Sequence, residues 1–296
     1  MRKMNTIGFL LVAATASMVG CSNHKPENSA EPQFDLAAHC LSKEAITKQR
    51  AQRALPCNAD VLLRRFDQSS VANFDKAMLS AKHGQVFLPP KEYSDVVDCG
   101  KPAVPGLIRL ITNRDGYIGD AAWGALDEIT NRRFGTHEPA PNPPDAVQRA
   151  AVAEKYQKWW EENKAKSETD WLLADIGLND EQGWAAIYKL GVSGDRAAIP
   201  ALKSLLGNIY LGPRAAVALA WLGDESAVPV LVDYYMASDS EPLRETGICE
   251  AYALTGQTMN FNPNGSPEER KEALKRWHRW YEQRVGDSGT DRVQPK

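Results

Sequence analysis

Cysteine is the residue type in this sequence with the clearest potential for chemistry. The five cysteines are Cys21, Cys40, Cys57, Cys99 and Cys249. Cys40 and Cys57 flank a predicted helix at 42–54, so a disulfide between them would join this helix to the next and stabilise the fold by about 3 kcal/mol. Cys99 precedes a helix and Cys249 falls inside a late one, and both are expected to be small core residues.

Two other states are open for Cys40 and Cys57. They could be buried free thiols, or they could bind a metal ion together with His39. A structural metal site needs a fourth ligand and short paired spacings, and the sequence offers neither. The disulfide is therefore favoured, and no metal ligands are predicted.

Signatures of known catalytic centres are absent from the sequence. It contains no Gly-x-Ser-x-Gly, no phosphate-binding glycine run and no His-Glu-x-x-His. The five histidines are scattered along the chain. We therefore predict no catalytic residue, no cofactor and no enzymatic activity.

Two polar loops, at 135–145 and 260–267, are the better candidates for binding. Both are rich in proline or glycine, and long loops on a helical scaffold often carry binding residues. The side chains that could contact a partner are Arg132, Arg133 and His137 at the first loop, and Asn262 and Asn264 at the second. An ordinary solvated loop is the alternative, and the more common one, for the basic residues of the first loop.

The N-terminus carries an export signal. Arg2 and Lys3 precede an apolar run at 7–19, which is too short to cross a bilayer as a helix. The run ends in Gly20-Cys21, and this ending resembles the lipobox of bacterial lipoproteins. The resemblance implies cleavage before Cys21, a diacylglycerol on its thiol and acylation of the new N-terminus. Ser22 follows the cysteine, which in that family favours the outer membrane, on its periplasmic side.

The polar residues 21–33 hold no apolar cluster and are predicted to form a flexible tether. Charged residues make up 25% of the chain, hydrophobic residues 43%, and the formal net charge is −3. This composition is typical of a globular protein. The acidic balance argues against nucleic acid as a partner, because such binding needs a basic surface.

Three short segments share the pattern Ala, β-branched residue, Pro, any residue, Leu. They are 103–107, 198–202 and 227–231. Proline is favoured at the first position of a helix, and the following apolar residues fall on one face. Each segment therefore predicts the start of a buried helix, followed by a turn and a second helix. Gly194-Asp195 and Gly223-Asp224 are predicted to end one helix and cap the next.

A longer repeat is superimposed on these helix starts. The first and third helix pairs each precede a polar loop and then an aromatic helix, which holds Tyr156, Trp159 and Trp160 in one copy and Trp277, Trp280 and Tyr281 in the other. These rings could stack on sugars, but their regular spacing favours packing of the helix onto its helix pair.

The pattern of helix starts, with Arg214 or Arg244 early in the second helix, resembles the HEAT-repeat family. The resemblance implies an all-α fold, namely an α-solenoid of HEAT-like helical hairpins with a helical N-terminal cap, and a protein-binding surface. The expected layout is a signal peptide at 1–20, a tether at 21–33, a helical cap at 34–95, a first HEAT-like module with its aromatic helix at 96–166, degenerate linking helices at 167–193, repeats and a second module at 194–284, and a disordered tail at 285–296.

We therefore expect a bacterial HEAT-repeat lipoprotein, anchored to the membrane through Cys21, that acts as a scaffold for a protein partner in the cell envelope. Two alternatives follow from the same residues. One is a periplasmic immunity or inhibitor protein for a toxin or hydrolase. The other is a lyase-like enzyme built on the same repeats.

Overall fold

The computed structural model describes residue 40 and residues 42–53, 56–68, 91–113, 116–135 and 145–290. Within these ranges all regular elements are helices, which confirms the all-α class. The chain divides into two compact units, one formed by residues 46–230 and the other by 1–45 with 231–296. The expected signal peptide and most of the tether-to-cap region lie outside the described residues.

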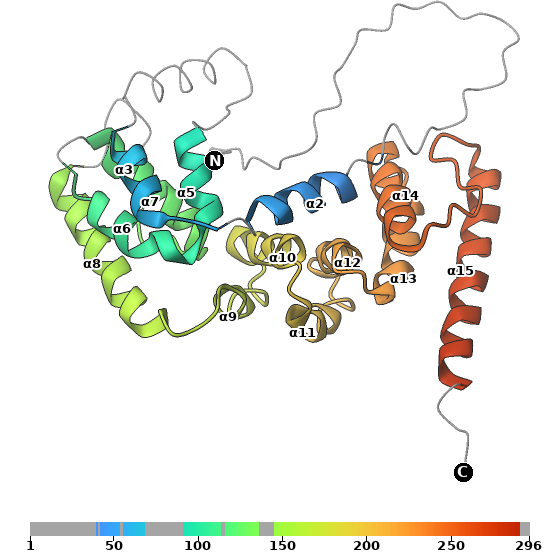
Figure 1. Cartoon of the computed structure of the whole chain (residues 1–296). Helices are drawn as coiled ribbons and strands as arrows, with labels where there is room; N and C mark the ends of the chain where they lie inside the picture. The colour runs from blue at the N-terminus through green and yellow to red at the C-terminus, as the bar shows by residue number, and fades with distance from the viewer. Residues whose placement is uncertain are drawn as a thin grey trace, which may run out of the picture. The chain divides into compact units, whose positions relative to one another are not determined.

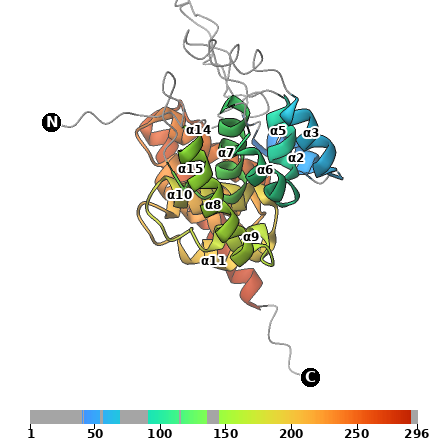
Figure 2. The same ribbon diagram turned by 90° about the vertical axis from the view of Figure 1, so that its left-hand side faces the viewer.

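The larger unit contains most of the helices (Figure 1). In chain order they are α2 (Ser42–Arg53, from Ile46 onwards), α3 (Ala59–Asp67), α5 (Lys91–Cys99), the 3-10 turn η1 (Lys101–Ala103), α6 (Val104–Leu110), α7 (Gly116–Thr130), α8 (Ala146–Asn163), α9 (Glu168–Leu173), α10 (Glu181–Ser193), η2 (Arg196–Ala198), α11 (Ile199–Ser204), α12 (Gly212–Trp221), η3 (Glu225–Ala227) and α13 (Val228–Val230). Figure 2 shows α3, α5 and α6 grouped together, as their mutual packing requires. The expected cap helices α3 and α5 thus share a unit with the first helix pair.

The three repeated segments start helices as predicted. Each begins with a 3-10 turn and continues into α6, α11 or α13. The alanine that opens the repeated pattern is fully buried in all three segments, as Ala103, Ala198 and Ala227. Before the last two, Gly194 and Gly223 adopt left-handed φ angles of 77° and 75°. Asp195 and Asp224 then accept hydrogen bonds from backbone N–H groups two residues later, each at 3.0 Å. The local sequence therefore sets these helix ends.

The smaller unit is built on the third pair. The π-helical η4 (Leu231–Met236) packs against α14 (Glu241–Thr255), and α15 (Pro267–Thr290) follows. Gly247 allows the close approach of η4 and α14, since a Cβ there would lie 2.7 Å from the Cβ of Tyr235.

The expected disordered tail at 285–296 is corrected in part, because α15 continues to Thr290. Adding residues to an existing helix costs far less free energy than starting a new helix. This low cost offsets the unfavourable helix propensity of the two glycines in this stretch.

The two longer modules share hydrogen bonds at matching positions. Thr130 Oγ1 donates to the carbonyl of Leu126 at 2.7 Å, and Thr255 Oγ1 donates to that of Ala251, also at 2.7 Å. The next residue is left-handed in both copies, Asn131 in one and Gly256 in the other. Their φ angles are 57° and 72°. The same device therefore ends α7 and α14.

The aromatic helices also begin in the same way. Gln148 and Asp145 exchange side-chain and backbone hydrogen bonds at the start of α8. Ser266 and Glu269 do so at the start of α15. Such a capping box satisfies backbone N–H groups that the first turn leaves unpaired. The repeat seen in the sequence is therefore also a repeat of local structure.

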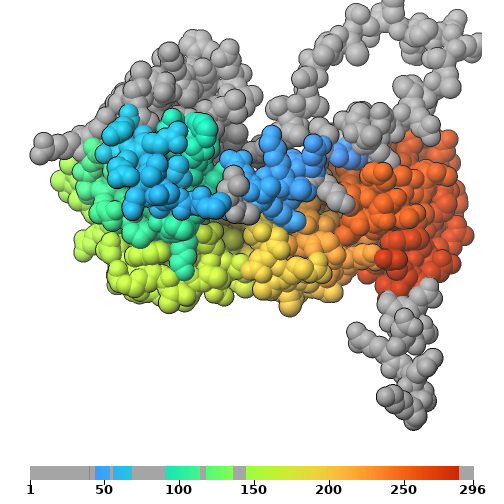
Figure 3. Space-filling view, in the orientation of Figure 1, coloured from blue at the N-terminus to red at the C-terminus, as the bar shows by residue number. Residues whose placement is uncertain are grey.

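Arg50 of α2 binds the ends of two helices in the larger unit. Its Nε donates to the carbonyl of Val192 at 2.9 Å, and its Nη2 donates to the carbonyls of Gly191 and Trp221, each at 2.8 Å. These carbonyls end α10 and α12, where a positive charge is favourable. A Cβ at Gly194 would lie 3.0 Å from Arg50 Nε, so glycine leaves room for the guanidinium. α2 is otherwise a polar helix on the surface, with most of its described side chains exposed (Figure 3).

The disulfides differ from the expected Cys40–Cys57 pair. Cys57 pairs with Cys99, with a Cα–Cα distance of 5.5 Å, and Cys40 pairs with Cys249, with a Cα–Cα distance of 4.9 Å. The expected pairing is wrong because α2 separates Cys40 from Cys57. Its 12 residues span about 18 Å as a helix, whereas a disulfide needs Cα atoms within about 7 Å. Cys99 and Cys249 each form a disulfide, which the sequence did not predict for them. Cys249 is buried in the core, as expected, whereas Cys99 is half-buried.

Peptide mapping of the non-reduced protein tests this pairing. We expect one cross-linked peptide pair that contains Cys57 and Cys99 and another that contains Cys40 and Cys249. Both should separate on reduction. A cross-linked peptide joining Cys40 to Cys57 would contradict the structure.

Candidate functional site

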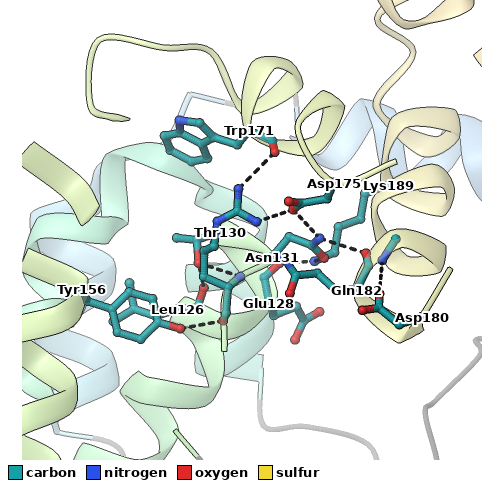
Figure 4. A network of polar contacts seen from close by, with 12 residues as sticks. Leu126, Glu128, Thr130, Asn131, Tyr156, Trp171, Asp175, Asp180, Gln182 and Lys189 are labelled. Atoms are coloured by element: carbon teal, nitrogen blue, oxygen red, sulfur yellow. Dashed lines mark hydrogen bonds and ion pairs between the residues drawn. The ribbon is translucent and has the colours of Figure 1, made fainter. Parts of the chain in front are cut away.

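The first candidate loop begins where α7 ends, at Asn131. Asparagine adopts the left-handed conformation more readily than other non-glycine residues. The side chain is buried, and its Nδ2 donates to Asp175 Oδ2 and to the carbonyl of Gln182, both at 3.0 Å (Figure 4). Asn131 therefore fastens the end of α7 to the residues that follow α9 and to the start of α10.

Arg132 forms an ion pair with the same carboxylate. Its Nη1 contacts Asp175 Oδ2, and the two side chains are only 16% and 6% exposed. The guanidinium also lies 5.9 Å from the centre of the Trp159 ring, within the range of a cation–π interaction. The charge of Asp175 is thus balanced by one cation and one amide donor, away from solvent.

Lys189 of α10 completes this polar network. Its Nζ donates to the carbonyl of Glu128 at 2.6 Å and to Asn131 Oδ1 at 3.1 Å. Burial of the amine lowers the pKa of Lys189 to about 8, against the opposing effect of the Glu128 carboxylate. The amine therefore remains mostly protonated at neutral pH. It places a positive charge at the C-terminal end of α7, where the helix dipole favours one.

The network leaves little of Arg132 for a partner. Arg133 is more accessible, because its ion pair with Glu181, at 3.0 Å, is about half exposed on both sides. His137 lies outside the described residues. Of the residues predicted to bind at this loop, the structure therefore assigns Arg132 to internal support and leaves Arg133 on the surface.

The second candidate loop is held by its own hydrogen bonds. The backbone N–H of Asn264 donates to Asn262 Oδ1 at 3.0 Å, and Arg244 Nε donates to the carbonyl of Pro263 at 2.6 Å. Asn264 is exposed, whereas Asn262 is half-buried. The loop is thus rigid, and the side chain of Asn262 supports the turn.

An open depression of about 460 Å³ adjoins this loop. It is lined by Asn260, Asn262, Glu268, Glu269, Glu272 and Arg276. Glu269 accepts hydrogen bonds from Ser266, and Glu272 pairs with Lys275 at 2.6 Å. These local bonds lower the pKa of both carboxyl groups. Much of the acidic lining therefore stabilises the start of α15.

The aromatic helices pack as predicted. Tyr156 and Trp277, at matching positions of the two modules, are both fully buried, and Trp159 is 8% exposed. Trp160 and Trp280 are half-buried. The rings of Trp159 and Trp171 meet edge to face, with centroids 5.0 Å apart. Tyr156, Trp159 and Trp277 therefore belong to the core, whereas Trp160 and Trp280 keep part of their surface exposed.

A different surface gathers exposed aromatic side chains, and sequence reasoning missed it. We call it the α10–α12 face. It consists of the exposed side chains of Trp184, Tyr188, Ile209, Tyr210 and Arg214, and of the half-buried Trp221, whose ring meets that of Tyr188 edge to face. α10 and α12 lie side by side, and Gly191 allows this, since a Cβ there would be 2.8 Å from the Cα of Ala218. The available signal was the spacing of Trp184 and Tyr188, which puts both rings on the face of α10 opposite its buried Leu190.

Neither the family models nor the curated proteins searched include a match to this sequence. In the described part of the chain, no helix combines the length and apolar character needed to cross a membrane. The same residues contain no group of three or more His, Cys, Asp or Glu side chains placed to hold a metal ion.

Replacement of Asp175 tests the structural role of the polar network. Asp175→Ala should lower the free energy of unfolding by about 3–5 kcal/mol, because it leaves Arg132 as a buried charge without its partner. Glu181→Ala removes the exposed pair of Arg133 and should cost about 0.5 kcal/mol or less. Denaturant titration measures both. Equal losses in the two variants would contradict the role assigned to Asp175.

Proposed function

We propose that this chain is an exported, lipid-anchored protein that binds a protein partner through a HEAT-like α-solenoid. The repeated helix starts support the solenoid. Each of the three leads into a helix that packs against the next, namely α6 with α7, α11 with α12 and η4 with α14. Repeats of such pairs bury their apolar faces against neighbouring pairs.

The observation that carries protein binding is the α10–α12 face. Ile209 and Tyr210 are 75% and 58% exposed, and Trp184 is 37% exposed. Tryptophan, tyrosine and arginine dominate the energetics of protein interfaces, because they contribute large contact areas and directed polar groups. A face with this composition on two packed helices suits a partner protein.

The disulfides support export. Cys40, Cys57, Cys99 and Cys249 form two pairs, and such bonds persist in oxidising compartments. Cys21 lies outside the described residues, and its sequence context supports the lipid anchor. The proposed location is the bacterial cell envelope, with the protein held on the periplasmic side of the outer membrane.

Loss of the acylated residue tests the anchor. Cys21→Ser should move the protein from the membrane fraction to the periplasmic fraction, because a serine hydroxyl is not the thiol that receives the lipid. Fractionation of cells that express either form measures this. A serine variant that sediments with the membranes as the parent does would contradict lipid anchoring.

Photo-crosslinking in intact cells tests protein binding. A photoreactive residue is introduced singly at exposed positions, for example Val147, Tyr210, Tyr234 or Tyr252. We expect a discrete, reproducible product with one other protein from at least one position, and no such product from the others. Products absent at every position would contradict a protein-binding function.

A further inference from the structure

Arg214 on the α10–α12 face is held in place by two contacts. Its guanidinium carbon lies 4.1 Å from the centre of the Trp184 ring, and its Nη1 donates to the carbonyl of Tyr210 at 2.9 Å. The stacking on the indole fixes the plane of the guanidinium group, and the hydrogen bond to the backbone fixes its position. The side chain is nevertheless exposed.

No carboxylate pairs with Arg214 in the described residues. Other arginines of the same unit pair with carboxylates, since Arg53 lies 3.9 Å from Asp98 and Arg133 lies 3.0 Å from Glu181. A guanidinium has five N–H donors, and the Tyr210 carbonyl is the acceptor that the described chain supplies to Arg214. The remaining donors are available for a bidentate contact with an external carboxylate.

The backbone that carries the apolar side chains beside Arg214 is held by hydrogen bonds. Asn208 Oδ1 accepts the backbone N–H groups of Tyr210 and Leu211, at 2.9 Å and 3.0 Å, and this fixes the turn between α11 and α12. Ile209 and Tyr210 thus project from an ordered turn while remaining largely exposed. A surface that is already ordered loses little conformational entropy on binding.

We propose that the α10–α12 face binds an acidic segment of a partner protein that carries apolar side chains beside its carboxylates. One carboxylate forms a bidentate pair with Arg214, and a neighbouring apolar side chain packs against Trp184, Ile209 and Tyr210. This inference rests on the proposed protein-binding function and names the site and the chemistry of its partner.

The site favours a peptide over a sugar chain. The fixed polar group at its centre is a cation that lacks a carboxylate within the described chain, and a neutral sugar would not supply one. One face of the Trp184 ring is moreover covered by the guanidinium and is not open for stacking. An acidic segment matches both the charge and the apolar surroundings.

The test uses the purified mature protein and a short synthetic peptide in which aspartate alternates with leucine. Binding is followed through the indole N–H signal of Trp184 in NMR spectra, identified by its loss in Trp184→Phe, and through calorimetry. We expect the peptide to shift this signal. A matched peptide with asparagine in place of each aspartate should bind at least about tenfold more weakly, and this comparison needs no protein variant.

Two protein variants with the same change of charge provide the control. Arg214→Gln should weaken peptide binding by about tenfold or more. Arg109→Gln, at an exposed arginine of α6 on another surface, should leave the affinity within about twofold. Unchanged melting temperatures establish that both variants are folded. Arg214→Lys should restore binding only in part, because a lysine ammonium lacks the planar fork.

Several results would overturn the proposal. They are equal binding of the asparagine peptide, equal loss in the Arg109 variant, an unshifted Trp184 signal, or a shift caused by N-acetylglucosamine oligomers in place of the peptide. If cellular crosslinks form but the acidic peptide does not bind, this inference fails and the proposed function stands. If neither occurs, both fail.

Discussion

The carbonyl groups at the ends of short helices need hydrogen-bond donors, and much of this structure depends on how they are supplied. Every helix leaves its last four carbonyls without intrahelical donors, so a chain of many short helices has many such groups. Cations from distant segments supply donors here. Arg50 binds the ends of α10 and α12, Lys189 binds the end of α7, and Arg196 Nη1 donates to the carbonyl of Leu222 at 2.7 Å. Arg50 and Lys189 thereby tie together helices of different pairs, and Arg196 ties the start of α11 to the end of its own partner α12.

This use of cations explains why the basic character of a loop is a poor guide to binding. Arg132 stands in a polar loop, yet its charge is balanced by the buried Asp175. Arg244 likewise donates to three backbone carbonyls, that of Pro263 in the second loop and those of Ser238 and Asp239 in the turn before α14. Arg214 differs because its guanidinium stacks on an exposed indole and donates to a single carbonyl, while the side chain stays exposed. The environments of Arg132 and Arg244 assign them to internal support, and the environment of Arg214 is the reason for proposing it as a binding residue.

The two longer modules show which contacts a repeat conserves. Both keep the threonine hydroxyl bond, the left-handed residue after it and the capping box of the aromatic helix. They also keep a cation that donates to a loop carbonyl, from Lys155 to Phe134 in one and from Arg276 to Met259 in the other. The side chains differ at most other positions, and the loops between these points also differ in length, running over residues 131–145 in one module and 256–266 in the other. A fixed frame with variable loops is consistent with a scaffold that presents different surfaces.

The sequence by itself determined the helix starts, the left-handed glycines with their aspartate caps and the buried aromatic helices. These features depend on hydrogen bonds and side-chain periodicity within a few residues, so they can be read locally. The left-handed conformation of Asn131 could not be predicted in this way, because it depends on the distant partners of the asparagine side chain.

Tertiary structure decided the disulfide pairing and the role of each arginine. Cys40 meets Cys249 across 209 residues, and the α10–α12 face needs two helices to lie side by side. Such contacts depend on how helices pack, and local propensity carries no information about which distant groups then meet. For that reason the candidate loops were visible in the sequence, while the α10–α12 face, which we propose as the binding surface, emerged only from the fold.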